Sequence, residues 1–258
     1  MTFDPGIGKA KARATGILDE YGLRRGGDAD LENLAYDRGL LVASREMTGA
    51  EGRLVRKGKQ AIATINDGIY NEGKRNFVVA HEFGHFELHE DSPLFLCDES
   101  DFVDWHRHRP EETEANQFAA ELLMPRGWFI REASAVELSI EEVSRLAELC
   151  GVSLTAAAFR CVELDVTPSA LAFCQDNEIK WSNVSDSFPY QYIRGDGEPD
   201  GYSGAWEYFG EGIDHQDPIE TPADAWFGDY DISEDDTVIE QCLVMSRLNA
   251  TLSLIWQV

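Results

Sequence analysis

The sequence is poor in basic side chains and has no long apolar run. Lysine and arginine together number 22, against 48 aspartates and glutamates, so the formal net charge is −26. A surface of this sign repels phosphate backbones and anionic lipids, which disfavours direct binding to nucleic acid or to membranes. The longest apolar stretches are short pieces such as FVVA and ALAF. Because a membrane-spanning helix needs roughly 18 or more apolar residues, we expect none.

Cysteine is also scarce and irregularly spaced. The sequence has no CxxC pair, and its five cysteines lie far apart, at Cys97, Cys150, Cys161, Cys174 and Cys242. This pattern is unlike a disulfide framework or a cysteine-rich zinc site, so we expect reduced thiols in the core. The first thirty residues are charged and interrupted by glycine, without the apolar core of a signal peptide. Both features predict a cytoplasmic protein.

The acidic excess is greatest towards the C-terminus. Residues 165–258 contain 19 acidic and 3 basic side chains, whereas residues 1–164 contain 29 and 19. A solvated acidic face would account for this excess. Attraction of a basic protein partner would also account for it, so both interpretations stay open.

The hydrophobic pattern of the first ninety residues predicts an α+β fold. Apolar spacing of three and four residues predicts two short helices, and alternating or β-branched stretches then predict a small antiparallel sheet. The helices are expected within 8–22 and 28–39, and the strands at 40–47, 52–59 and 60–67. Asn71 is placed to cap a further helix over 71–89, with Glu72 in its first turn.

A pair of helices with helix-turn-helix spacing is predicted after residue 138. Ser139 and Glu142 form a capping box for a helix over 139–149, and Gly151 turns the chain into a second helix over 153–164. Such a pair in isolation would suggest DNA reading. Its glutamates outnumber its basic side chains, however, so neither helix offers a phosphate-binding face. We expect a packing role and no direct contact with nucleic acid.

The sequence pattern changes beyond Pro168. Short strand-like pieces follow, separated by loops rich in glycine and aspartate: SALAFCQ, EIKWSN, IEQCLVM and TLSLIWQ. They predict a separate β-containing unit. Its tryptophans are compatible with core packing and with a regulatory or substrate-recruiting role.

The clearest chemical signal is the HExxH motif His81-Glu82-Phe83-Gly84-His85, inside the predicted helix 71–89. Two histidines one turn apart project from the same helix face and can converge on one metal ion. In zinc hydrolases the metal lowers the pKa of water to about 7, and a neighbouring carboxylate takes the proton. The apolar FVVA before the motif predicts a buried helix, and Gly84 permits close approach of another backbone. Glu82 is therefore the expected general base.

A zinc hydrolase site usually needs a third protein ligand. His89 lies about 12 Å from His81 along a helix, which is too far for both to share one ion. The metzincin pattern HExxHxxGxxH also fails, because Leu88 occupies its glycine position. A third ligand must therefore come from elsewhere in the chain.

A second helix, over 110–124, offers that ligand. Pro110 suits its first turn and Pro125 ends it. Glu111 and Glu112 both flank its apolar stripe, so periodicity does not choose between them. Its small residues Ala119 and Ala120 are expected to allow close packing near Gly84.

The segments HEFGHFELH and ETEANQFAAELLMP together resemble the ImmA/IrrE family of zinc-dependent metallo-endopeptidases, which are related to thermolysin in catalytic arrangement. The resemblance covers about residues 10–165. It implies that Glu112, four residues before Asn116, is the third ligand beside His81 and His85. Asn116 could hold a ligand in place by a hydrogen bond, and a plain capping or surface role is equally compatible. The implied cofactor is Zn²⁺, with Mn²⁺ or another divalent ion as the alternative.

The resemblance also implies a division of the chain. We expect a thermolysin-like minimal zinc-peptidase domain over 1–134, with helices packed on the small antiparallel sheet, and a helix-turn-helix-like subdomain over 135–167. Residues 168–258 are expected to form an acidic α/β or β-rich domain, for which regulation is one interpretation.

The family implies a substrate as well. Its members act on helix-turn-helix repressors, so we expect cleavage of a basic transcriptional repressor in a stress, phage or mobile-element response. The alternative is a metal-binding regulatory protein that sequesters a partner without proteolysis.

Two further features stay open. The loop histidines His106 and His108 could stabilise an oxyanion or bind substrate, although solvated histidines are common in loops. The predicted strand 60–67 could present an edge to an extended peptide, or could be an ordinary core strand.

Overall fold

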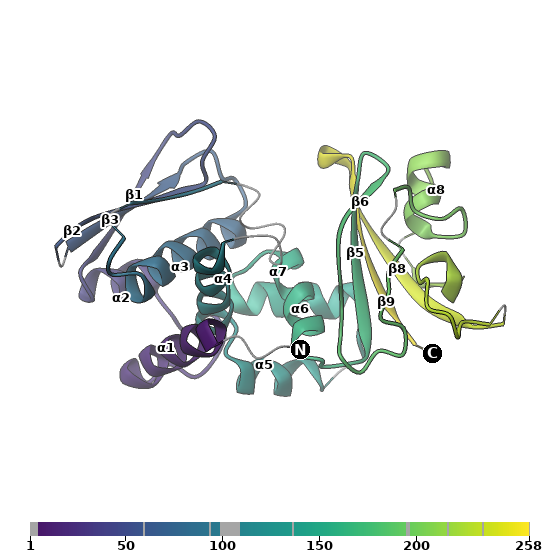
Figure 1. Cartoon of the computed structure of the whole chain (residues 1–258), viewed down its shortest axis with the longest axis horizontal. Helices are drawn as coiled ribbons and strands as arrows, with labels where there is room; N and C mark the ends of the chain where they lie inside the picture. The colour runs from purple at the N-terminus through teal and green to yellow at the C-terminus, as the bar shows by residue number, and fades with distance from the viewer. Residues whose placement is uncertain are drawn as a thin grey trace. The chain divides into compact units, whose positions relative to one another are not determined.

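The computed structural model describes residues 5–257, except Lys59, Pro93, 99–108, Val136, 195–196, Gln216 and Glu234. The chain forms two compact units (Figure 1). The first unit comprises Met1–Arg131 and Leu146–Ala156, and the second comprises Glu132–Arg145 and Ala157–Val258. No helix in the part of the chain that the structure describes is long and apolar enough to cross a membrane.

The first unit contains a four-stranded sheet of order β1-β3-β2-β4. Its strands are β1 (Leu40–Arg45), β2 (Gly52–Lys57), β3 (Gln60–Asn66) and β4 (Leu94–Cys97). The predicted α+β class is confirmed, but the sheet is mixed rather than antiparallel, because β1 and β3 are parallel. β3 lies between β1 and β2 in the sheet. It is antiparallel to β2, with which it forms a hairpin, and parallel to β1. The predicted strand over 60–67 is thus paired on both sides and presents no edge to a peptide.

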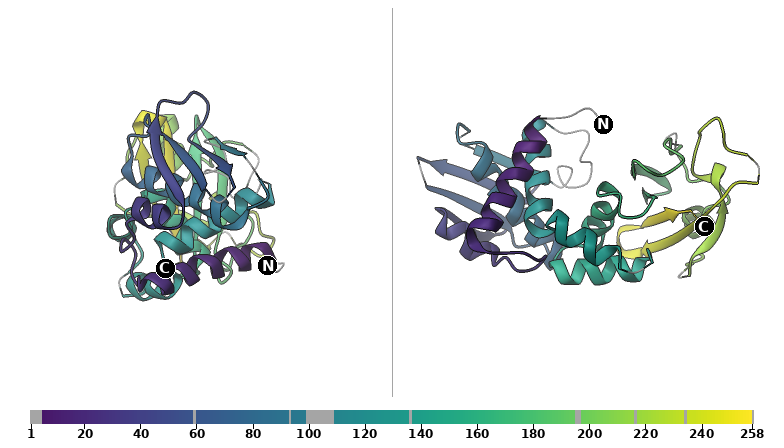
Figure 2. Two further views of the ribbon diagram at one scale, coloured as in Figure 1. Left: turned by 90° about the vertical axis from the view of Figure 1, so that its left-hand side faces the viewer. Right: turned by 90° about the horizontal axis from the view of Figure 1, so that it is seen from below.

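The first unit also contains the helices α1 (Pro5–Tyr21), α2 (Leu31–Asp37), α3 (Glu72–Leu88), α4 (Pro110–Leu123) and α5 (Arg126–Ala133). Of these, α2 and α3 lie against one face of the sheet (Figure 1). As predicted, Asn71 caps α3, since its side-chain oxygen accepts from the backbone N–H of Lys74 at 2.8 Å. Helix α3 packs against β1, β2 and β3, and α1 lies along α4 (Figure 2). The short helix α5 was not predicted.

The predicted helical pair is present as α6 (Ile140–Cys150) and α7 (Leu154–Glu163). The N–H of Glu142 donates to the hydroxyl of Ser139 at 3.2 Å, which is the predicted N-terminal cap. The division between the two units falls inside both helices. A separate subdomain over 135–167 therefore stays a prediction.

The second unit contains an antiparallel five-stranded sheet of order β6-β5-β9-β8-β7. Its strands are β5 (Ser169–Gln175), β6 (Glu178–Val184), β7 (Ile219–Pro222), β8 (Thr237–Met245) and β9 (Ala250–Trp256). The strand-like pieces predicted beyond Pro168 correspond to four of these strands. Helix α8 (Gly204–Glu211) was not predicted, because it is short and lies between loops, so it offers few residues in which apolar periodicity can be recognised. Trp226 and Phe227 are buried in the core of this unit.

Candidate metal centre

Helix α3 carries the HExxH motif through the interior of the first unit. Every residue from Phe77 to Phe86 on this helix is buried. His81, Glu82 and His85 each have 0% of their surface exposed. The apolar residues FVVA before the motif and Phe83 within it favour this burial, because they give the helix apolar surface on more than one face.

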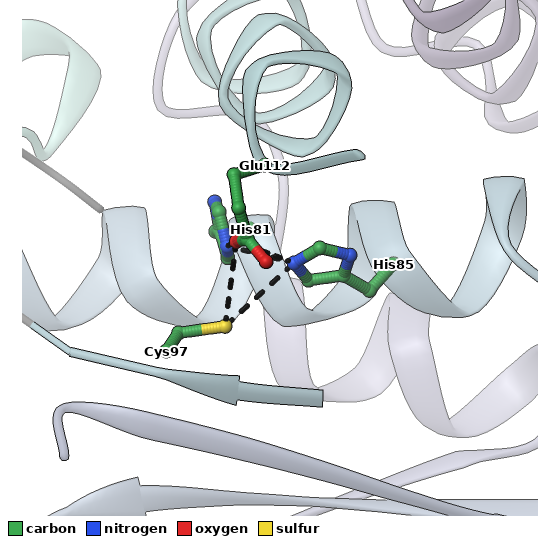
Figure 3. Close-up of side chains that lie close together, drawn as sticks. All are labelled: His81, His85, Cys97 and Glu112. Atoms are coloured by element: carbon green, nitrogen blue, oxygen red, sulfur yellow. Dashed lines mark hydrogen bonds and ion pairs between the residues drawn. The ribbon is translucent and has the colours of Figure 1, made fainter. Parts of the chain in front are cut away.

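The two motif histidines and Glu112 converge at one point (Figure 3). His81 Nε2 and His85 Nε2 lie 2.9 Å apart. Glu112 Oε2 lies 3.2 Å from His81 Nε2 and 3.1 Å from His85 Nε2. Glu112 is fully buried, whereas Glu111 is exposed. The structure thus brings together Glu112, and not Glu111, with the two histidines.

Close packing of α3 and α4 makes this convergence possible. A Cβ atom on Gly84 would lie 3.1 Å from Ala115 Cα and 3.1 Å from Phe118 Cδ1. A Cβ at position 84 would therefore require Ala115 or Phe118 to shift by a few tenths of an ångström, and Gly84 avoids this crowding. The predicted role of Gly84 agrees with this geometry, but the α4 residue nearest to it is Ala115, one turn before the predicted Ala119.

The outer nitrogen atoms of both histidines have partners that determine their tautomers. His81 Nδ1 lies 2.8 Å from the side-chain carbonyl oxygen of Asn116, so this nitrogen carries a hydrogen and donates it. His85 Nδ1 lies 3.0 Å from His89 Nδ1, and His89 Nε2 lies 3.1 Å from Glu114 Oε2. Since Glu114 accepts, His89 donates to it from Nε2, and its Nδ1 accepts from His85. Both motif histidines are then left with a lone pair on Nε2.

This donor set suits a divalent cation. Two Nε2 lone pairs and a carboxylate oxygen face one another within 3.2 Å, an arrangement that a cation between them would stabilise. Burial and the neighbouring His81 lower the pKa of His85 to about 3. Glu112 also accepts from the guanidinium of Arg109, which favours its ionised form. Neutral imidazole and ionised carboxylate are the forms that bind metal.

Glu82 lies on the sheet side of the motif helix. Its carboxyl group is so close to Gly52, the first residue of β2, that a Cβ atom there would overlap it. Gly52 therefore leaves the space that Glu82 occupies. Sequence reasoning missed this residue, because a glycine at the start of a strand is a common turn signal.

Cys97 is a second residue that sequence reasoning missed. All five cysteines are buried and none forms a disulfide, which agrees with the prediction of reduced thiols. Cys97, however, lies beside the candidate metal cluster, with Sγ 3.6 Å from His85 Nε2 and 3.8 Å from Glu112 Oε2. The pattern LFLC, with Phe95 and Cys97 buried on one face of β4, was the available signal. Phe95 stacks on the ring of His85 at 4.0 Å.

Arg109 approaches the cluster from its rim. Its guanidinium donates to Glu112 Oε1 at 2.8 Å, so the carboxylate oxygen that does not face the histidines is also engaged. His106 and His108, the loop histidines considered in the sequence analysis, lie outside the described residues.

Comparison with known proteins identifies a family for the part of the chain that holds the cluster. Residues 37–162 match the model Peptidase_M78, which describes the IrrE N-terminal-like domain. The match includes β1 to β4 and α3 to α6, and it confirms the resemblance drawn from the two motifs.

Two individual proteins are also similar. "Uncharacterized immunity region protein 2" of Bacillus phage phi105 is 31% identical over 80 residues, which is 31% of this chain and 48% of that protein. The match thus spans about half the length of this curated relative. A solved structure of a Mycobacterium tuberculosis transcriptional regulator has a TM-score of 0.62 at 15% identity, covering 96% of this chain and 76% of that one. At this identity, the likeness shows the fold alone.

Proposed function

Since residues 37–162 belong to the IrrE N-terminal-like peptidase family, we propose that this chain is a zinc-dependent endopeptidase. His81, His85 and Glu112 hold the metal, with Mn²⁺ or another divalent ion as an alternative occupant. Asn116 positions His81 through its Nδ1 hydrogen. The observation that carries the proposal is the convergence of two imidazole nitrogens and a carboxylate oxygen within 3.2 Å in a buried site.

Glu82 is the general base in this proposal. A zinc ion in a site of this kind acidifies a water molecule and polarises the scissile carbonyl. Glu82 accepts the proton of the attacking water and then donates it to the departing amine. It follows His81 directly on α3, and its carboxyl group occupies the space that Gly52 leaves.

The proposed substrate is a basic helix-turn-helix repressor in the cytoplasm. The matched phage protein is named for an immunity region, which supports action on a regulatory protein. The net charge of −26 favours encounter with a basic partner. A stress, phage or mobile-element response is the corresponding setting.

The test is to compare the wild type with Glu82→Gln in two assays. Metal content per chain is measured after removal of excess ions, and cleavage of a repressor encoded beside this protein is followed by mass spectrometry. We expect about one metal ion in both proteins, and a cleavage rate reduced roughly 10²–10⁴-fold in the variant, because the base is lost while the ligands remain.

The matched control is Glu111→Gln, since Glu111 is an exposed carboxylate one residue before Glu112. It should retain both metal and cleavage. Full cleavage by Glu82→Gln, or a wild type that binds no metal when zinc is supplied, would refute the proposal. Repressor inactivation without any cleaved product would support sequestration instead.

A further inference from the structure

The buried thiol of Cys97 lies on the side of the cluster that faces the sheet (Figure 3). Cys97 is the last residue of β4, which pairs with β2 at the edge of the sheet. The backbone N–H of Glu51 donates to the carbonyl of Cys97 at 2.9 Å, so the position of this residue is set by the strand pairing. Its side chain has 0% of its surface exposed.

The distances around Cys97 match those between ligands of one tetrahedral ion. Zinc bonds are about 2.0–2.1 Å to nitrogen or oxygen and about 2.3 Å to sulfur, which places two ligand atoms about 3.3 Å apart, and a sulfur about 3.6 Å from the others. The histidine and glutamate ligand atoms are 2.9–3.2 Å apart. Sγ lies 3.6 Å from His85 Nε2 and 3.8 Å from Glu112 Oε2. The distances that involve Sγ are longer than those between nitrogen and oxygen atoms, as the longer zinc–sulfur bond requires.

We propose that Cys97 is a fourth metal ligand, whose thiolate closes the coordination position that a hydrolytic water needs. This inference rests on the proposed metal site. Catalytic zinc sites leave one position open, whereas sites with four protein ligands are closed. The chain with β4 in place is then a latent peptidase, and it cleaves its substrate only while Cys97 is displaced from the metal.

Opening the site requires a ligand exchange without any oxidant or reductant. The metal–sulfur bond breaks, the thiolate takes up one proton, and a water molecule occupies the vacated position. β4 has only four residues, and the sheet order gives it a single neighbouring strand. Separation of its end from β2 would therefore carry Cys97 away while the ligands on α3 and α4 stay in place.

The test uses the full chain loaded with Co²⁺ in place of zinc. A cobalt–thiolate bond produces a charge-transfer band in the near ultraviolet that nitrogen and oxygen ligands do not. We expect this band in the wild type and its loss in Cys97→Ala and in the closer-fitting Cys97→Ser. Cys174→Ala is the matched control, because Cys174 is also fully buried but lies on β5 of the other unit, and it should keep the band.

Two further measurements test the closed position itself. Release of zinc to a chelator should be at least about tenfold faster in Cys97→Ala, because loss of a direct ligand should cost at least as much as the roughly 10–100-fold effect of losing a ligand's hydrogen-bond partner. Acetohydroxamate, which binds open zinc sites, should bind the cobalt form of Cys97→Ala at least about tenfold more tightly than the wild type.

The outcomes separate this inference from the function on which it rests. Cobalt bound without a thiolate band, or equal hydroxamate affinity in the wild type and Cys97→Ala, would overturn the role of Cys97 and leave the peptidase proposal standing. Failure of the wild type to bind any metal would overturn both.

Discussion

Glu112 in the first unit and Glu240 in the second are both fully buried, yet their surroundings are opposite. Glu240 is surrounded by donors. Its Oε2 accepts from the indole N–H of Trp226 at 2.9 Å and from the backbone N–H of Gly204 at 3.0 Å, and its Oε1 accepts from the hydroxyl of Ser253 at 2.7 Å. Glu112 faces two imidazole nitrogens whose hydrogens are engaged elsewhere.

The difference teaches how to distinguish a buried carboxylate with a structural role from a candidate metal ligand. Burial raises the pKa of Glu240, and its neutral donors reduce that effect without removing it. Glu112 accepts on Oε1 from the guanidinium of Arg109 at 2.8 Å, but its Oε2 faces the Nε2 lone pairs of His81 and His85. A carboxylate whose hydrogen-bonding capacity is met by donors is a packing element, whereas one that faces lone pairs has a place for a cation.

The largest expected contrast between the two glutamates is in metal affinity. Glu112→Gln should weaken zinc binding more than a hundredfold, because loss of a direct ligand exceeds the roughly 10–100-fold effect of losing an outer hydrogen-bond partner. Glu240→Gln should leave the affinity unchanged. Competition with a chromophoric chelator measures both. Equal zinc affinities of the two variants would show that Glu112 contributes no more to metal binding than Glu240 does.

The contributions of His85 and Glu240 to the free energy of unfolding should change with pH in opposite directions. The pKa of His85 is lowered from 6.5 to about 3 in the folded state, so between these values the unfolded chain binds the proton and the folded chain does not. The free energy of unfolding of the metal-free protein should then fall by about 2–3 kcal/mol between pH 6.5 and 4.5 from this group alone. For Glu240 the raised pKa has the reverse sign: its contribution is greatest at low pH and is lost as the pH rises.

Urea unfolding of metal-free variants at several pH values isolates these contributions. His85→Gln should remove about 2–3 kcal/mol of the loss of stability between pH 6.5 and 4.5, and Glu240→Gln should remove the contribution of Glu240 that is lost above about pH 4.5. A wild type and His85→Gln with the same pH dependence would show that His85 is not held neutral by burial.

The smallest expected effect concerns the hydrogen-bonded chain behind the cluster. His89→Ala should weaken zinc binding about tenfold, because His85 loses the acceptor that orients its ring and determines its tautomer. His89→Gln can restore an acceptor and should recover part of the affinity. An unchanged affinity in His89→Ala would show that stacking on Phe95 alone orients His85.

Much of the fold was predictable from local patterns. The cap at Asn71, the helix that carries HExxH and the strand-like pieces beyond Pro168 all depend on residues near one another in the sequence, so side-chain periodicity and capping chemistry indicate them. The parallel pairing of β1 with β3 could not be predicted in this way. Strand order depends on which strands the chain brings together after the hairpin forms.

The sequence by itself determined the chemistry of the motif helix: two histidines one turn apart, a carboxylate between them and a glycine that admits a second helix. Only the tertiary structure decided between Glu111 and Glu112, and only it brought Gly52, His89 and Cys97 to the same place. Glu111 and Glu112 differ by about 100° around α4, and the choice between them depends on how that helix docks on Gly84. Contacts made by packing between distant segments have no periodic signal in the chain.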